Sequence, residues 1–154
     1  MKQIPTHAQV EVEVRYAETD QMGVVHHATY LVWFEVARTR LCALSGFHYA
    51  ELERRGHLLM VTGAELKFRR SLRYGDTAEV TAWLDHLGSR GMKFAYEVHR
   101  TGELCVTGTT EHLWVDASSG RPMRCPAEVE APFAALAETR SPSQKGASSP
   151  LLDA

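Results

Sequence analysis

The chain has 154 residues, of which 44% are hydrophobic, and a formal net charge of −2 at pH 7. This length suits one domain that buries a core without metal ions, and the charge gives no basic field for nucleic acid. Cys42, Cys105 and Cys125 lack the spacing of a zinc site or a disulfide framework. No stretch reaches the roughly 20 apolar residues of a membrane-spanning helix, and no apolar leader follows Met1, so we expect a cytoplasmic protein.

Hydrophobic periodicity predicts the elements of the first third of the chain. Apolar residues alternate over residues 10–16, which predicts a strand with one buried face. Residues 18–23 have the composition of a loop. Over residues 28–44 the apolar spacing changes to three and four, which predicts a long helix buried on more than one side and ended by Gly46. A shorter helix is expected over residues 49–55.

The rest of the chain is predominantly strand-like. Short turns separate four alternating segments, which we predict as strands at about residues 58–72, 77–84, 92–98 and 104–115. Strands joined by such short links must be antiparallel. One long apolar helix and one antiparallel sheet predict a two-layer α+β domain over residues 1–138, which includes a last helix near residues 127–136. Residues 139–154 are rich in Ser, Pro, Gly and Lys and are predicted to be a disordered tail.

The densest group of candidate functional residues links the first strand to the long helix. Asp20 lies in the loop, where functional groups concentrate, although a lone Asp before a helix is more often a turn former. The helix begins shortly afterwards, and its unpaired N–H groups present partial positive charge. His26 and His27 are adjacent and lack HxxxH or HExxH spacing, so we expect their side chains to point apart and bind no metal.

The same residues resemble a known family. The matching pattern is Tyr16…Thr19-Asp20-x-x-Gly23-Val24-Val25-x-His27-Ala28-x-Tyr30, followed by Phe34-Glu35-x-Ala37-Arg38. It resembles the hotdog-fold acyl-CoA thioesterases of the 4-hydroxybenzoyl-CoA thioesterase-like family, nearest to the subgroup around the thioesterase of the Tol–Pal cell-envelope cluster. The order of predicted elements is also that of the hotdog fold, a curved antiparallel sheet wrapped around one central helix. Thr29 departs from that subgroup, which usually has Asn there.

The resemblance implies roles for three loop residues. Asp20 takes the position of the catalytic carboxylate, and His27 that of the residue whose backbone N–H polarises the thioester carbonyl. Gly23 lets the loop turn closely against the substrate. In chemical terms, Asp20 can attack the carbonyl and form a mixed anhydride, or it can deprotonate a water molecule. Neither route requires a cofactor.

The resemblance also implies substrate-binding residues and an oligomer. Sites of this fold resemble clefts shared between two subunits, so we expect a homodimer at least and a homotetramer in the complete assembly. The acyl group should contact Val24, Val25, Tyr30 and Met60. Arg90 should grip a CoA phosphate, since relatives carry basic residues in this turn.

The predicted function is hydrolysis of an acyl-CoA, or a related acyl thioester, to free acid and thiol. A Gly-x-Ser-x-Gly motif is absent from the sequence, which excludes an α/β-hydrolase type of serine esterase. A hotdog hydratase resembles a pattern with Asp and His about five residues apart, whereas Asp20 and His27 are seven apart. A non-catalytic module that binds acyl-CoA or acyl-carrier protein is the other alternative. Glu35 is the second candidate carboxylate, although an ion pair with Arg38 is its default interpretation.

Overall fold

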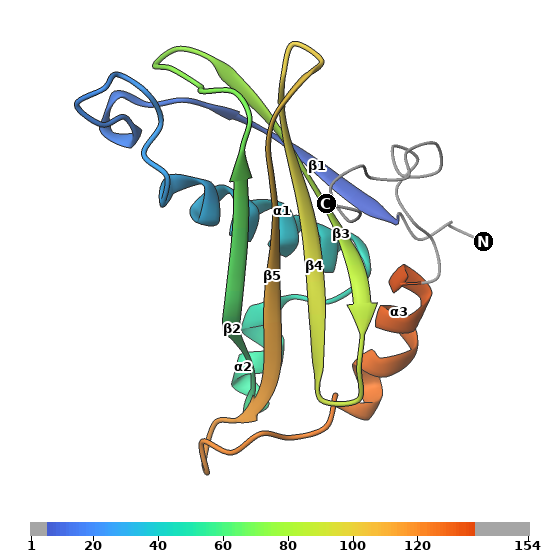
Figure 1. Ribbon diagram of the computed structural model, residues 1–154. Coiled ribbons are helices and arrows are strands. Elements are labelled where there is room, and N and C mark those ends of the chain that lie inside the picture. Colours follow the sequence, from blue (N-terminus) through green and yellow to red (C-terminus); the bar gives the residue numbers. More distant parts are fainter. Residues whose placement is uncertain (1–5, 138–154) are drawn as a thin grey trace, which may run out of the picture.

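The computed structural model describes residues 6–137 as one curved sheet with helices against it (Figure 1). The strands are β1 (His7–Glu13), β2 (His57–Phe68), β3 (Thr77–Leu87), β4 (Gly91–Arg100) and β5 (Glu103–Asp116). Their order across the sheet is β1-β3-β4-β5-β2, and every neighbouring pair is antiparallel. The predicted antiparallel sheet is confirmed, and β2 forms one of its edges.

The long helix α1 (Thr29–Leu44) lies across one face of the sheet, which confirms the predicted α+β architecture (Figure 1). Phe34 of α1 stacks on Tyr96 of β4, with ring centroids 4.2 Å apart and planes 5° apart. Gly108 of β5 makes this approach possible, since a Cβ atom there would lie 2.5 Å from the Phe34 ring. The sheet and the helix therefore meet at a position that only glycine fits.

Two short helices complete the described part of the chain. Helix α2 (Tyr49–Arg54) follows α1, and helix α3 (Ala127–Ala137) packs its Phe133 ring near Trp114 of β5. Among residues 6–137, no helix is long and apolar enough to cross a membrane. The domain end predicted at residue 138 and the predicted tail, residues 139–154, lie outside the described residues.

Some details of the predicted elements are wrong, among them the end of β2, which lies at Phe68 and not near residue 72. The first strand ends at Glu13, and Tyr16–Glu18 forms a 3-10 turn, η1, because the buried Glu18 carboxylate accepts hydrogen bonds that bend the chain back. Helix α1 is also not buried on more than one side within one chain. Val32 and Val36 are 58% and 48% exposed, so an apolar stripe of α1 faces away from its own sheet.

A buried polar chain runs from α1 into the sheet. Arg38 Nη1 donates to the Tyr96 hydroxyl over 2.9 Å, and that hydroxyl lies 2.6 Å from Thr110 Oγ1. Thr110 Oγ1 in turn lies 2.7 Å from His112 Nε2. Burial of His112, helped by the positive charge of Arg38, lowers the pKa of this imidazole to about 3. His112 is therefore neutral in the folded protein near neutral pH.

This neutral histidine predicts acid sensitivity. Below pH 6.5 the unfolded chain protonates His112, whereas the folded chain resists protonation until about pH 3. The free energy of unfolding should therefore fall as the pH drops across this interval. Thermal melts should show a smaller loss of Tm over that interval for His112→Gln than for the wild type. The exposed His86 provides the matched control, His86→Gln, and equal slopes for the two variants would contradict the assignment.

Candidate active site

A tight turn holds Asp20. The Asp20 N–H donates to the Val24 carbonyl over 2.9 Å, and the Gly23 N–H donates to the Asp20 carbonyl over 3.0 Å. Gly23 has a φ of +77°, in the left-handed region that favours glycine. Asp20 Oδ1 accepts the Met22 N–H at 2.8 Å, while Oδ2 has no partner within the described residues. Asp20 thus forms the turn, and one carboxylate oxygen stays available for chemistry.

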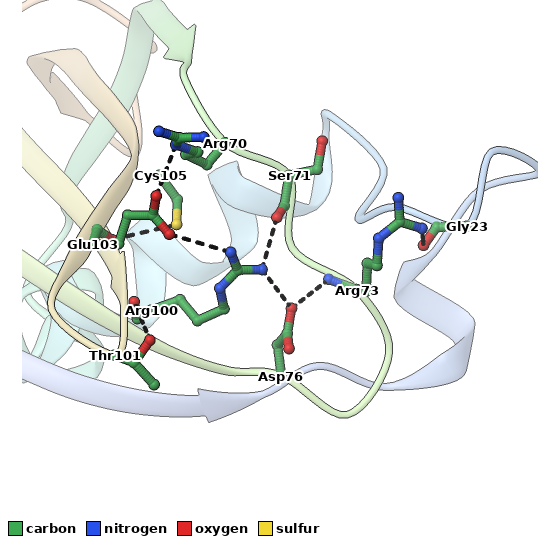
Figure 2. A network of polar contacts seen from close by, with 9 residues as sticks. All are labelled: Gly23, Arg70, Ser71, Arg73, Asp76, Arg100, Thr101, Glu103 and Cys105. Carbon is green, nitrogen blue, oxygen red and sulfur yellow. Dashed lines mark hydrogen bonds and ion pairs between the residues drawn. The ribbon is translucent and has the colours of Figure 1, made fainter.

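Backbone hydrogen bonds fix the rest of the loop on both sides. The Val25 N–H donates to the Leu72 carbonyl and the His26 N–H donates to the Glu18 carbonyl, each over 2.8 Å. Arg73 reaches the Gly23 carbonyl through Nη1 at 3.4 Å (Figure 2). The loop is therefore held between η1 and the segment that joins β2 to β3.

That joining segment has its own polar network (Figure 2). Asp76 Oδ2 accepts the Arg73 N–H at 2.8 Å and lies 3.1 Å from Arg100 Nη1. The same Nη1 donates to the Ser71 carbonyl over 3.1 Å, and Nη2 lies 3.3 Å from Glu103. These ion pairs are half-buried, and together they brace the backbone that carries the Asp20 loop.

The start of α1 presents an unpaired backbone donor. The Thr29 N–H donates to the His26 carbonyl, and the Ala28 N–H donates to His26 Nδ1. The His27 N–H makes no hydrogen bond to any residue between 6 and 137. It lies on the partly positive end of the helix, so it can donate to a developing oxyanion.

The side chains of the two adjacent histidines do not point apart as predicted. Their rings stack with centroids 4.2 Å apart, because His26 and His27 lie in the turn that starts α1 and not in extended backbone. Within the described residues, no group of three or more His, Cys, Asp or Glu side chains is placed to hold a metal ion.

Three of the residues predicted to contact the acyl group lie in or next to the Asp20 loop, and two of these three have buried side chains. Val25 and Tyr30 are buried, whereas Val24 is half-buried. Burial raises the pKa of Tyr30 to about 12. A hydrogen bond from the Leu72 backbone lowers this pKa, but its effect is smaller than that of burial. Tyr30 therefore stays neutral and supports the loop from the core.

Met60 and Arg90 lie far from Asp20 within one chain. Leu113 of β5 pairs with Met60 on one side and with Gly91, next to Arg90, on the other. The Asp20 loop is hydrogen-bonded to Leu72, which lies beyond the end of β2 at Phe68. Phe68 follows Met60 by eight residues, so the strand separates the two by about 26 Å at roughly 3.3 Å per residue. Figure 1 likewise shows the β3–β4 turn and the loop before α1 at opposite ends of the molecule.

Sequence reasoning missed a cavity of about 220 Å³ between α1, α2 and the first half of β2. It is lined by Glu35, Arg38, Tyr49, Leu52, Glu53, His57, Leu59, Val61 and Trp114. The expected Glu35–Arg38 ion pair does not form among the described residues, because Arg38 turns inward to two tyrosine hydroxyls. The spacing offered a signal, since Arg38 follows Phe34 by four residues and precedes Leu41 by three on the buried face.

Comparisons with known proteins show to which family the chain belongs. Residues 14–133 match the family described as the Thioesterase-like superfamily. A Bacillus subtilis protein, provisionally named acyl-CoA thioesterase YneP, is 42% identical over 115 residues, which cover 74% of this chain and 83% of that protein. These comparisons do not single out the Tol–Pal-associated subgroup, which stays a prediction.

Solved structures share the fold as well as sequence. DHNA-CoA thioesterase from Staphylococcus aureus is 32% identical with a TM-score of 0.80, over 86% of this chain and 89% of that one. A Thermus thermophilus protein described as hypothetical is 38% identical, also with a TM-score of 0.80, over 84% of this chain and 97% of that one.

Glu18 should be important for the stability of the loop. Burial raises the pKa of its carboxyl group, but hydrogen bonds from Arg15 and from the Trp33 indole outweigh burial and hold the pKa below its ordinary value. Glu18→Gln removes the charge that these donors favour and should cost about 1–3 kcal/mol of unfolding free energy. Denaturant titration checks this, with the exposed Glu13→Gln as control. Equal losses of unfolding free energy in the two variants would show that Glu18 does not stabilise the loop.

Proposed function

Because the chain belongs to the Thioesterase-like superfamily of hotdog proteins, we propose that it is an enzyme that hydrolyses the thioester of an acyl-CoA to a free carboxylic acid and CoA. The names of its relatives, an acyl-CoA thioesterase and a DHNA-CoA thioesterase, support this activity. The observation that carries the proposal is the Asp20 turn, which keeps a carboxylate oxygen unpaired shortly before the unpaired His27 N–H.

In the proposed mechanism, the His27 N–H binds the thioester carbonyl oxygen. The negative charge that grows on this oxygen in the tetrahedral transition state is stabilised by that donor and by the helix end. Asp20 supplies the attack, either directly or by taking a proton from water. The CoA thiolate is a good leaving group, so no strong general acid is required.

The complete site takes residues from two chains in this proposal. Strand β2 is an edge strand, and Met60 and Val61 on it are exposed, as are Val32 and Val36 on α1. Two copies that pair their β2 edges about a two-fold axis run antiparallel, so the first half of one β2 approaches the second half of the other. Such pairing brings the Met60 and Arg90 end of one copy toward the Asp20 loop of its partner. A tetramer and a cytoplasmic location stay predictions from the sequence.

Replacing Asp20 tests the proposed chemistry. Asp20→Asn keeps the shape of the side chain and its bond to the Met22 N–H but removes its charge and basicity. We expect kcat for acyl-CoA hydrolysis, followed by thiol release, to fall roughly a hundredfold to ten-thousandfold.

Glu35→Gln is the matched control, because Glu35 is the other candidate carboxylate and has no ion-pair partner within the described residues. A folded Asp20→Asn protein with normal kcat would exclude Asp20, and loss of activity in Glu35→Gln would favour the helix glutamate. Binding of acyl-CoA without any hydrolysis by the wild type would favour the non-catalytic module, and hydration of an enoyl-CoA would favour the hydratase.

The shared site predicts that assembly and activity are lost together. Light scattering should give at least twice the 17.2 kDa chain mass for the wild type. Val36→Glu puts a charge on the exposed apolar stripe of α1 and should yield monomers with little activity. Arg121→Glu, at an exposed turn after β5, should leave both unchanged. A Val36→Glu monomer with wild-type kcat/KM would contradict a site made from two chains.

A further inference from the structure

One residue, His26, anchors the turn that starts α1 through three hydrogen bonds. Its N–H donates to the Glu18 carbonyl over 2.8 Å, and its carbonyl accepts the Thr29 N–H at 2.9 Å. Its side chain makes the third bond, since Nδ1 accepts the Ala28 N–H at 3.1 Å. An imidazole nitrogen accepts a hydrogen bond only when it carries no proton, so the His26 ring carries its proton on Nε2. Of the three consecutive N–H groups at residues 27–29, His26 accepts two, and that of His27 has no partner within the described residues.

These bonds determine where the His27 N–H points. The His26 carbonyl and the His27 N–H belong to one planar trans peptide unit, so they point in opposite directions. Because that carbonyl accepts the Thr29 N–H, it points into the first turn of α1, and the His27 N–H points away from the helix. The Ala28 N–H belongs to the next peptide unit, which the bond to Nδ1 holds. Both peptide units that flank the His27 Cα atom are therefore fixed by His26.

Only one of the three bonds depends on which residue occupies position 26. Every residue except proline supplies a backbone N–H, and every residue supplies a carbonyl. An acceptor for the Ala28 N–H, by contrast, needs a side chain with a polar atom close to the backbone, as helix-capping residues have. The His26 ring is exposed and stacks on the His27 ring, with centroids 4.2 Å apart. The side chain thus makes two interactions, the hydrogen bond and the ring stack, which substitutions can separate.

We propose that His26 is a positioning residue for thioester hydrolysis, whose Nδ1 atom holds the turn so that the His27 N–H meets the thioester oxygen. This inference rests on the proposed function, in which that N–H stabilises the oxyanion. Without an acceptor at Nδ1, the peptide unit between His27 and Ala28 is free to rotate, and the orientation of the His27 donor is no longer fixed. An oxyanion donor is most effective when it is held in place before the charge develops. The loss should therefore appear in kcat and not in KM.

Two substitutions at position 26 separate the hydrogen bond from the ring stack. His26→Asn removes the ring but places an amide oxygen on Cγ, where Nδ1 is attached, and asparagine accepts hydrogen bonds from the N–H two residues on. It should keep kcat within about threefold of the wild type. His26→Phe keeps a ring that can stack on His27 but has no acceptor. It should lower kcat by about tenfold, less than the roughly hundredfold cost of removing an oxyanion donor outright, and leave KM within about twofold. His26→Ala, which also lacks an acceptor, should show the same loss.

Another histidine that precedes a helix provides the matched control. His48 lies directly before α2, is exposed, and makes no capping hydrogen bond with its side chain, so His48→Phe should leave kcat and KM unchanged. Hydrolysis is measured by thiol release, and melting curves give the folded fraction, so that kcat refers to folded enzyme.

The outcomes distinguish this inference from the proposed function. Wild-type kcat in His26→Phe and His26→Ala, equal losses in His26→Asn and His26→Phe, or a loss confined to KM would each overturn the positioning role while hydrolysis by the wild type stands. A wild type that hydrolyses no acyl-CoA would overturn the proposed function, and the positioning role with it.

Discussion

The contact between Phe34 and the sheet determines where the other parts of the molecule lie. The Phe34 ring stacks on Tyr96 and occupies the space that a side chain at position 108 would need. This contact sets the depth of α1 against β4 and β5. At one end of the same helix, the His27 N–H is presented beside the Asp20 loop. One turn after Phe34, Arg38 reaches the hydroxyl of the same Tyr96. The site loop and the cavity are therefore both positioned by one helix–sheet contact.

Backbone hydrogen bonds fix the conformation of the Asp20 loop on both of its sides. Carbonyls of Glu18 and Leu72 hold the loop on its two sides, and both belong to segments with their own supports. Glu18 is fixed by donors from Arg15 and Trp33, while the segment after β2 is braced by Asp76 and its partners. This arrangement holds the Asp20 carboxylate in a defined direction without burying it, as its proposed role in catalysis requires.

The sequence allowed the fold to be predicted because its signals are local. Apolar and polar residues alternate along the strands, and apolar residues recur every three or four positions along α1. These patterns were enough to predict the two layers and the antiparallel strands. The 3-10 turn at Tyr16–Glu18 is closed by a local bond from the Arg15 N–H to Glu18, but the Trp33 indole that buries and fixes this carboxylate lies 15 residues away and gave no signal in the sequence. The inward turn of Arg38 was missed for the same reason, since Tyr49 and Tyr96 come from other elements. Interactions between residues far apart in the sequence leave little signal in the spacing of residue types along the chain.

The positions of Met60 and Arg90 indicate that one chain alone does not form the complete proposed site. Both were expected near the acyl-CoA, yet each lies at the end of the sheet opposite Asp20. The exposed stripe with Val32 and Val36 on α1 and the free edge of β2 are the features that a second copy would cover. A two-chain site accounts for all of these positions together, since it joins the loop of one chain to the Met60 and Arg90 end of the other.

A mixed dimer tests this central claim most directly. One chain carries Asp20→Asn, the other carries Arg90→Ala, and two different affinity tags isolate the heterodimer. If each site joins the Asp20 loop of one chain to Arg90 of the other, one site has both substitutions and the second has neither. The heterodimer should then hydrolyse acyl-CoA with about half the wild-type kcat and the wild-type KM. A heterodimer with a raised KM, as Arg90→Ala alone should have if Arg90 binds a CoA phosphate, would place the loop and Arg90 of each site in the same chain and contradict the account.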